Sequence, residues 1–407
     1  MATTQLRSAP SSIRLVEIVT DAASVAAFLR GHLRHFRECG YDVYVISSPH
    51  PCLAEIAADC GVTTIPLSIS REISPLKDLY SLVMLCLLLR RIRPHLVAAG
   101  TPKGSLLGML AAWAVGTPVR VYKLVGLRLE TCTGFKRWLL SWTERITSAC
   151  AQRVISISPS LSAAYLSAGY CSPEKLDDRI LSSHGVDGSV YRPRRSSPEV
   201  AALRTQLGIA ENDLVIGFVG RLTRDKGLGD LLTAFRRVQP QQPAARLLLV
   251  GEFEAGDPVA STVRQELEAD PRVILTGSVS DTSPYYNLMD VFAFPSYREG
   301  LPNAPLEAAC TEIPVVGFAA TGTVDAVVDG ETGWLVPVGD AAALAERLLH
   351  SLNDPVERAA QGAAGRQRAL CRFSPTGVHT QFERLYRALL AERGLVQSSH
   401  KPIARVA

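Results

Sequence analysis

The sequence has 407 residues, 47% hydrophobic and 20% charged, which is an ordinary globular composition in a chain too long for one compact core. Two domains are therefore expected. The nine cysteines are scattered and never spaced as C-x-x-C, which argues against a disulfide framework or a zinc site and suits a reducing compartment. The net charge of +4 conceals an asymmetry. Residues 1–195 hold 23 Lys and Arg against 14 Asp and Glu, whereas residues 196–407 hold 20 against 25, so the first half is basic enough to meet an anionic surface.

The N-terminus lacks the features of an export leader. Residues 1–12 are polar, and Ile13–Thr20 has the pattern of a strand. The longest apolar run, Leu82–Leu89, is far shorter than the roughly 18–20 residues that span a bilayer and predicts a buried helix. We therefore expect a cytoplasmic protein.

Short β-rich runs alternate with longer helical stretches along the whole chain, which is typical of parallel sheets covered by helices. The strands expected in the first half are Ile13–Thr20, Tyr41–Ser47, Thr63–Pro66, His95–Ala98, Arg120–Val125 and Val154–Ile157. Those expected in the second half are Leu214–Gly220, Arg246–Val250, Val273–Leu275, Val291–Ala293 and Pro314–Gly317. The prediction is an α/β protein with two doubly wound, Rossmann-like domains that face each other across a cleft, where the carboxyl ends of the strands bind ligands.

The domain boundaries follow from breaks in these periodicities. Residues 191–198 are rich in proline and serine and predict a linker between a first domain, residues 1–190, and a second, residues 199–372. Residues 373–394 predict a C-terminal helix that packs back on the first domain, and residues 395–407 a frayed tail.

A glycine-flanked turn opens the first helix of the second domain. Gly220-Arg-Leu-Thr-Arg-Asp-Lys-Gly227 follows an expected strand, and the amides of such a turn suit a phosphate. Arg221 and Lys226 add two cations, the charge that a departing diphosphate needs. An exposed basic turn is the alternative interpretation.

Two carboxylates follow in the segment P-S-Y-R-E-G-L-P-N-A-P-L-E, directly after a later strand. Glu299 falls in the loop and Glu307 in the next helix, where Glu307 can accept two hydrogen bonds from a ribose diol. The amides of Gly300, Leu301 and Asn303 at the helix start can cradle phosphate or sugar oxygens. An ordinary helix acid is the alternative interpretation of each carboxylate.

With these motifs, the second half resembles the donor domain of the retaining, GT-B-fold glycosyltransferases of family 4, in which a G-R-x-x-x-x-K-G turn precedes an E-x7-E motif. The resemblance continues through Leu249–Glu252, Leu275–Val279, Tyr286–Asp290 and Val324–Pro337. It implies an enzyme that moves a hexosyl or N-acetylhexosaminyl group from a nucleotide diphosphate sugar, with a UDP-sugar favoured, and a second domain that binds this donor.

The resemblance also implies a role for each matching residue. Arg221 and Lys226 would hold the diphosphate and Glu299 the hydroxyls of the donor sugar, so these three are the candidate catalytic residues. The candidate donor-binding residues are Glu307 at the ribose, Ser278 and Val279 at the base through their backbone, and Gly220, Gly300, Leu301 and Asn303 around them.

The first half resembles, more weakly, the branch of this family that builds bacterial capsule, exopolysaccharide and lipopolysaccharide. The similar segments are Ile73–Asp78, Thr101–Gly104 and Gly126–Thr131. The implied acceptor, on the side of the first domain, is a glycan or a polyprenyl-diphosphate-linked sugar. Lys103 and Asp21, in expected strand-to-helix turns, are candidate acceptor or donor contacts, and a surface lysine is the alternative for Lys103.

Two positions depart from the family pattern. The turn after the first strand, often Gly-Gly in the family, reads Thr20–Val25, and a His that commonly follows the fifth strand is replaced by Val125. A retaining transfer from the front side still needs no side-chain base, because the leaving phosphate oxygen can receive the acceptor's proton.

The sequence contains no D-x-D pair, and its cations supply positive charge, so we expect neither a metal nor another cofactor.

Other functions were compared with this one. A nicotinamide dehydrogenase should show G-x-G-x-x-G, which is absent, and basic residues are not interleaved with aromatics as in nucleic-acid-binding modules, so no nucleic acid partner is expected. A GT-B-fold sugar-nucleotide epimerase and a non-catalytic partner in a polysaccharide-assembly complex stay open as alternatives.

Two arginine clusters suggest a location. They are Arg30, Arg34 and Arg37 at helical spacing, and Arg90, Arg91 and Arg93 after the apolar run. They predict salt-sensitive, peripheral docking of the first domain on an anionic membrane surface at the inner face of the membrane, with solvated helix faces as the alternative.

Overall fold

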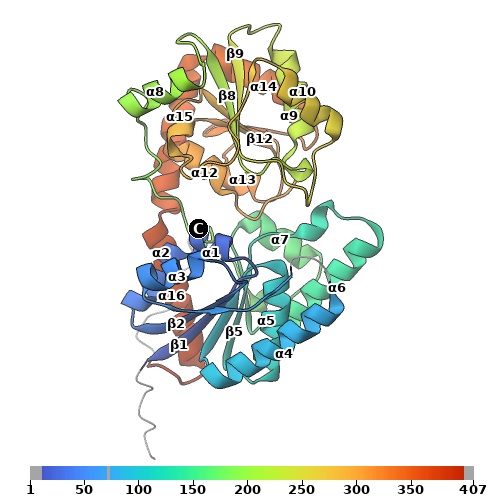
Figure 1. Ribbon diagram of the computed structural model, residues 1–407, viewed down its shortest axis with the longest axis vertical. Coiled ribbons are helices and arrows are strands. Elements are labelled where there is room, and N and C mark those ends of the chain that lie inside the picture. Colours follow the sequence, from blue (N-terminus) through green and yellow to red (C-terminus); the bar gives the residue numbers. More distant parts are fainter. Residues whose placement is uncertain (1–11, 71–73, 398–407) are drawn as a thin grey trace, which may run out of the picture. The chain divides into compact units, whose positions relative to one another are not determined.

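The structure, a computed structural model, describes residues 12–70 and 74–397 and divides them into two compact units (Figure 1). The first unit holds residues 12–70, 74–157, 162–184 and 375–397, and the second holds residues 158–161 and 185–374. The predicted polar N-terminus, Ile73 and the predicted tail beyond residue 397 lie outside the described residues.

The predicted linker at residues 191–198 belongs to the second unit. The backbone N–H of Arg194 donates to Asn287 Oδ1 at 2.6 Å, and the Arg195 guanidinium pairs with Asp290 at 3.1 Å. Each bond joins this stretch to the same loop, so the proline- and serine-rich sequence is fixed by polar contacts rather than by regular secondary structure.

The first unit is built on seven parallel strands in the order β3-β2-β1-β4-β5-β6-β7. Their bounds are β1 (Ile13–Ile18), β2 (Tyr41–Ser47), β3 (Thr63–Pro66), β4 (Leu96–Ala99), β5 (Val119–Leu124), β6 (Arg153–Ser156) and β7 (Leu176–Asp177). The central strands are buried on both faces, which explains why they read as continuous apolar runs. The chain reverses its direction across the sheet after β3, so the topological switch point lies between β1 and β4.

Helices cover both faces of this sheet. Right-handed crossovers place α1 (Ala22–Phe28), α2 (Arg30–Glu38) and α3 (Cys52–Cys60) on one face and α4 (Pro75–Ile92), α5 (Pro102–Ala114) and α6 (Gly134–Cys150) on the other (Figure 1). The remaining helical segments are η1 (Arg128–Thr131), α7 (Pro159–Ser167), η2 (Pro173–Lys175) and α16 (Pro375–Glu392), of which α7 has its first three residues in the second unit.

Helix α16 is the last in the chain, yet it completes the core of the first unit. Its Phe382 and Tyr386 are fully buried, and the rings of Tyr386 and Phe36 of α2 stack with centroids 5.2 Å apart. Leu395 and Val396, where the sequence predicted a frayed tail, pack against the same core.

A buried ionic cluster lies where α2 and α16 meet the sheet. Lys123 Nζ is 2.6 Å from Glu17 Oε2, and His32 Nε2 is 3.2 Å from Glu17 Oε1. Burial works against the Glu17 carboxylate, but Lys123 and His32 outweigh it and hold its pKa below the ordinary value. The ring of His379 on α16 lies edge-on to that of His32, and burial, followed by the neighbouring histidines, lowers the pKa of His379 to about 3.

The second unit repeats the doubly wound plan with six parallel strands in the order β10-β9-β8-β11-β12-β13. The strand bounds are β8 (Leu214–Val219), β9 (Ala245–Val250), β10 (Val273–Leu275), β11 (Val291–Phe294), β12 (Val315–Phe318) and β13 (Gly333–Val336). The helical segments are α8 (Pro198–Gln206), η3 (Arg224–Lys226), α9 (Leu228–Val238), α10 (Ser261–Ala269), α11 (Ser283–Tyr286), α12 (Asn303–Cys310), α13 (Thr323–Ala326), α14 (Ala341–Asn353) and α15 (Pro355–Arg372). The switch point lies between β8 and β11.

All eleven predicted strands are present, with ends shifted by at most two residues. The two that the sequence did not predict are β7 and β13. β7 has only two residues, too few to show a period, and β13 is a four-residue strand that begins at a glycine directly after the polar stretch 329–332.

The predicted buried helix over Leu82–Leu89 is only half correct. The run lies in α4, where Leu85 and Leu89 are buried, but Val83 and Leu87 are each about half exposed. A helix that lies on a sheet can bury only one face, and the sequence is apolar on both. Among residues 12–70 and 74–397, no helix combines the length and the apolar character that crossing a membrane requires.

The buried histidines should make the first unit sensitive to acid. Because the pKa of His379 is about 3 in the folded protein and 6.5 when unperturbed, the unfolded chain binds more protons between these values, so the free energy of unfolding should fall as the pH is lowered from 6.5 toward 3. His379→Gln should make this decline shallower by up to about 1.4 kcal/mol per pH unit. Urea titrations at several pH values measure it, with the exposed His50→Gln as the control. An equal slope in His379→Gln and the parent would contradict the assignment.

Candidate functional site

The predicted phosphate turn joins β8 to α9 at the switch point of the second sheet. It ends in η3 and in Gly227, which has φ +72° and caps α9. A Cβ on Gly227 would lie 2.0 Å from the carbonyl oxygen of Pro295, the first residue after β11. The turn therefore touches the neighbouring loop backbone to backbone, and only glycine fits there.

The ends of β8, β9 and β10 meet just as closely. A Cβ on Gly251, after β9, would lie 1.9 Å from the carbonyl oxygen of Gly220, after β8. The Gly251 N–H donates to the Gly277 carbonyl at 3.0 Å, which brings the exposed Ser278 and the half-buried Val279 to the same edge of the sheet. The predicted base-contacting backbone thus lies at the carboxyl edge that carries the phosphate turn.

Lys226 and Glu299 form an ion pair between these two loops. The side chains are 19% and 14% exposed, so the pair is largely shielded from water but still partly accessible. Ser296 Oγ donates to Glu299 Oε1 at 2.6 Å, and Lys226 Nζ lies 5.4 Å from the centroid of the Phe294 ring. These contacts hold the carboxylate and the ammonium in fixed positions.

Asp225, which the sequence analysis did not single out, strengthens the junction. Its carbonyl oxygen accepts from the Tyr297 N–H at 3.0 Å, and its carboxylate accepts from Arg298 Nε at 2.8 Å. The alternation of charges in R-D-K and Y-R-E was visible in the sequence, but which charges pair depends on the packing of the two loops.

Arg221 differs from Lys226 in its surroundings. Its side chain is 67% exposed and forms an ion pair with Glu254, which follows β9. The sequence predicted two cations for a diphosphate, and in the structure each of these cations has a carboxylate partner. A phosphate that approaches must therefore share or replace these carboxylates.

The start of α12 provides the backbone part of the predicted site. Pro302 caps the helix with an extended backbone, so α12 begins at Asn303, and the buried Gly300 and Leu301 immediately precede it. The Glu299 N–H donates to the Thr321 carbonyl at 3.1 Å, which fixes the approach to the helix. The first N–H groups of α12 have no partner within the helix, as at every helix start.

Glu307 lies on α12 and is bonded to tyrosines rather than facing open solvent. The Tyr286 hydroxyl donates to Glu307 Oε2 at 2.7 Å, and Tyr191 is a second hydrogen-bond partner. Burial raises the pKa of Glu307, while these hydrogen bonds act in the opposite direction. Two hydroxyl donors on one carboxylate leave acceptor capacity for a ligand, because a carboxylate offers about four lone-pair sites.

The candidate contacts in the first unit lie at its own switch point. The turns after β1 and β4 are joined by the hydroxyls of Thr20 and Thr101, 2.7 Å apart. Asp21 caps α1 by accepting from the Ala23 N–H at 3.4 Å, and Lys103 Nζ pairs with Asp78 at 2.8 Å. Both predicted residues thus take part in bonds within the unit.

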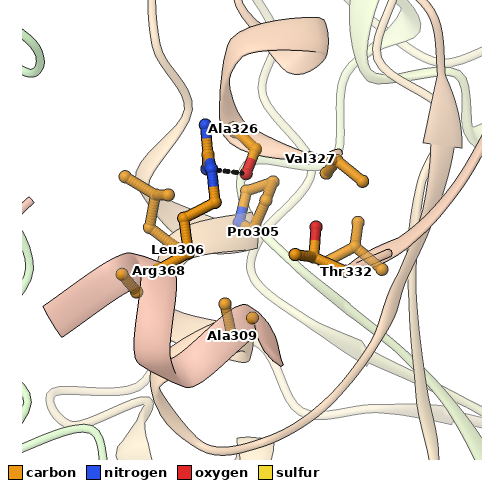
Figure 2. Close-up of a pocket in the computed structure, with 10 residues that line it drawn as sticks. Pro305, Leu306, Ala309, Ala326, Val327, Thr332 and Arg368 are labelled. Atoms are coloured by element: carbon orange, nitrogen blue, oxygen red, sulfur yellow. Dashed lines mark hydrogen bonds between the residues drawn. The ribbon is translucent and has the colours of Figure 1, made fainter. Parts of the chain in front are cut away.

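A pocket in the second unit lies between α12, α13 and α15 and not at the ion pair (Figure 2). It is lined mainly by small and apolar side chains, and Arg368 crosses it to donate to the Ala326 carbonyl at 2.8 Å. Pro305, Leu306 and Ala309 face it, whereas Glu307 does not line it. The pocket is a gap in helix packing.

Among the described residues, no three His, Cys, Asp or Glu side chains are grouped as a metal ion would need.

Comparison with known proteins gives the geometry its context. The family described as "Glycosyl transferases group 1" matches residues 213–354, and the "Glycosyl transferase 4-like domain" matches residues 25–177. The capsular polysaccharide biosynthesis glycosyltransferase CapM of Staphylococcus aureus is 33% identical over 382 residues, which cover 93% of this chain and 98% of CapM. The chain is a family 4 glycosyltransferase. The resemblance inferred from the sequence motifs is thereby confirmed.

One more distant relative of this glycosyltransferase and one solved structure of similar fold are informative. The UDP-Gal:alpha-D-GlcNAc-diphosphoundecaprenol alpha-1,3-galactosyltransferase of Escherichia coli is 24% identical over 319 residues, covering 78% of this chain and 81% of that protein. The crystal structure of Anabaena HepE in complex with UDP-glucose matches with a TM-score of 0.76 at 21% identity, covering 92% of this chain and all of HepE. The latter likeness concerns the fold, which is GT-B as predicted.

The close approach at Gly227 gives a test of the turn. Gly227→Ala should destabilise the glycosyltransferase by at least about 3 kcal/mol, because the new Cβ collides with the Pro295 carbonyl as well as straining φ. Gly208→Ala is the matched control, since Gly208 has φ +66° but no atom within 4 Å of its Cβ position, and it should cost only about 1 kcal/mol. Urea unfolding measures both, and equal losses would show that the loops do not touch.

Proposed function

We propose that this glycosyltransferase moves a sugar from a nucleotide diphosphate donor, with a UDP-sugar favoured, to a glycan or polyprenyl-diphosphate-linked sugar during assembly of a bacterial surface polysaccharide. The observation that carries the proposal is the Lys226–Glu299 ion pair at the switch point, between a glycine turn and a helix start. The names of the two curated relatives, one of capsule biosynthesis and one with UDP-Gal as donor and a diphosphoundecaprenol-linked acceptor, support the same reaction class. HepE, a protein of like fold, was crystallised with UDP-glucose.

The roles of the cations follow from where negative charge develops. As the bond between the anomeric carbon and the phosphate oxygen breaks, charge builds up on the leaving diphosphate, and Lys226 and Arg221 stabilise it. The Lys226 ammonium has three N–H donors, so it can keep its bond to Glu299 and still donate to a phosphate oxygen. Arg221, whose side chain is exposed, leaves Glu254 to reach the diphosphate.

The acids and amides position the donor. Glu299, held by Lys226 and Ser296, accepts hydrogen bonds from the sugar hydroxyls and so orients the anomeric carbon. Glu307 accepts from the ribose diol while its tyrosine partners keep it oriented. The amides of Gly300, Leu301 and Asn303 bind oxygens at the helix start, and the backbone of Gly220, Ser278 and Val279 meets the nucleotide.

Retention without a metal is the mechanism that this arrangement supports. The acceptor oxygen attacks the face from which the diphosphate departs, and its proton passes to the leaving phosphate oxygen, so no side chain must act as base. Val125 stands where many family members have a His and supplies no hydrogen bond to the transferred sugar. The two cations and the start of α12 supply the positive charge that a metal gives other enzymes.

We also propose that the glycosyltransferase acts in the cytoplasm, peripherally at the inner face of the membrane, where a polyprenyl-linked acceptor would be reached. All nine cysteines are free thiols, as a reducing compartment maintains them.

The donor can be identified by measuring which member of a panel of nucleotide sugars raises the melting temperature of the purified protein.

Loss of either cation should impair transfer. Arg221→Ala and Lys226→Ala should each lower turnover on the order of 100-fold with the fold intact, because each removes a group that neutralises charge in the transition state. Arg224→Ala is the matched control, since Arg224 is an exposed arginine of the same turn that pairs with Asp257, and it should remain near the parent activity. Steady-state kinetics with circular dichroism checks all three. Full turnover in both Arg221→Ala and Lys226→Ala would show that the donor's diphosphate does not bind at this turn.

The stereochemistry can be predicted without knowing the sugar. An α-linked donor should give an α-linked product, and EDTA should leave the rate unchanged, because the phosphate charge is met by Arg221, Lys226 and the helix start. Proton NMR of the anomeric signal and assays with chelator measure the two outcomes. A β-linked product, or loss of activity in EDTA that added metal restores, would overturn the mechanism.

A further inference from the structure

Exposed apolar side chains are concentrated on one face of the first unit. Ten of the eighteen large apolar side chains exposed among the described residues lie on α4, α5 and α6. They are Leu76, Leu79, Tyr80, Val83, Leu87, Trp113, Phe135, Trp138, Trp142 and Ile146, and we call them the α4–α6 surface. A monomeric protein rarely leaves such a cluster in water without a partner.

On α6 the exposed side chains form an aromatic ladder. Phe135, Trp138, Trp142 and Ile146 follow one another at intervals of three and four residues, which places them along one side of the helix. The rings of Phe135 and Trp138 stack with centroids 5.5 Å apart, and that of Trp142 follows at 6.2 Å. Exposing a tryptophan side chain to water is unfavourable because of its large apolar area, yet three of the four tryptophan residues in the chain lie on this surface.

Helix α4 presents a second stripe on the same side of the sheet. Its exposed residues, from Leu76 to Leu87, recur with the helical period, whereas Ser81, Leu85 and Leu89 form the buried side. Helix α5 packs against both α4 and α6 (Figure 1). Near its end it adds the exposed side chain of Trp113. The two stripes therefore flank one buried helix.

The charges of α4 and α6 are sorted by sign. Each helix has one acid, and both acids have partners within the unit: Asp78 pairs with Lys103, and Glu144 accepts from the hydroxyls of Tyr122 and Tyr165 at 2.9 and 3.1 Å. The bases of the two helices are all exposed, namely Lys77, Arg90, Arg91, Lys136, Arg137 and Arg145. Apart from the partnered acids, the charged side chains that α4 and α6 add around the apolar α4–α6 surface are thus all basic.

We propose that the α4–α6 surface docks the glycosyltransferase on a lipid bilayer with anionic head groups. Trp, Tyr and Phe side chains enter the interfacial layer, and the flanking bases meet the lipid phosphates. A second copy of the chain is a poor occupant, because a symmetric contact would place six exposed bases against six others. An anionic bilayer can bury the apolar side chains and at the same time neutralise the charge of the bases.

This surface differs from the one that the arginine clusters predicted. Arg30, on α2, pairs with Asp59 and lies 3.5 Å from Glu55, and Arg37 donates to the Tyr41 carbonyl at 2.8 Å. Helix α2 covers the opposite face of the sheet from α4, so the two clusters do not share a docking face (Figure 1). Only the Arg90–Arg93 cluster borders the proposed surface.

Docking adds to the proposed function, since a polyprenyl-linked acceptor lies in a bilayer, but it is tested without any sugar transfer. The purified full-length protein is floated with phosphatidylcholine vesicles that contain phosphatidylglycerol and, separately, with pure phosphatidylcholine. We expect binding to the first at low salt, weaker binding to the second, release as salt is raised, and a blue shift of the tryptophan fluorescence on binding.

Two variants and a control assign the binding to the surface. Trp138→Ser with Trp142→Ser, and Lys136→Glu with Arg137→Glu, should each lower partitioning at least about tenfold. Val356→Ser with Arg237→Glu, an equivalent change on exposed positions of the second unit, should leave it unchanged. Melting temperature and stabilisation by a nucleotide sugar report the fold and the donor site independently. No flotation of the parent, undiminished flotation of both surface variants, or a dimeric parent that the tryptophan variant converts to monomers would overturn the proposal.

Discussion

The contact between the turn after β8 and the loop after β11 is the constraint on which the donor side of the glycosyltransferase depends. Gly227 and Pro295 meet backbone to backbone, and this closeness brings Lys226 against Glu299. Ion pairs contribute little net stability, since exposed ones are worth about 0–1 kcal/mol and buried ones lose most of their attraction to desolvation. The pair is therefore better understood as a positioning device: it fixes a cation and an acceptor of hydrogen bonds side by side at the switch point, where one donor molecule presents both a diphosphate and sugar hydroxyls.

The first unit uses buried charge for a different end. Glu17 and Lys123 come from β1 and β5, and His32 and His379 from the two helices packed over them, so the cluster ties the sheet to α2 and α16. It lies among fully buried aromatic residues, where an unpaired charge would be expensive. One unit thus keeps its ionic contact reachable from solvent, and the other encloses it.

Much of this organisation could be predicted from the sequence, and the features that could not be predicted share one cause. The strands were predictable because buried parallel strands read as continuous apolar runs, and the phosphate turn because glycines and charges at fixed spacing are local features. The pairing of Arg221 with Glu254, the tyrosine partners of Glu307 and the hold of Asp225 on Arg298 join residues more than 20 positions apart, which no local pattern encodes. The prediction that α4 is buried was only half correct for the same reason. The helix is apolar on two faces, and packing decides which of them contacts the sheet.

The place of α16 has a consequence for synthesis. The second unit is formed by an almost continuous stretch of chain, but the first unit is completed only by a helix that begins at Pro375. As the chain leaves the ribosome, the first sheet must wait for the residues that cover it, about 10–40 s at the usual rate of elongation. During that interval the groove destined for Phe382 and Tyr386 is open, and the second unit has the residues it needs first. The second unit can thus fold before the first one is complete, although most of the first unit is synthesised earlier, and the uncovered apolar surface of the first sheet is exposed to aggregation for longer.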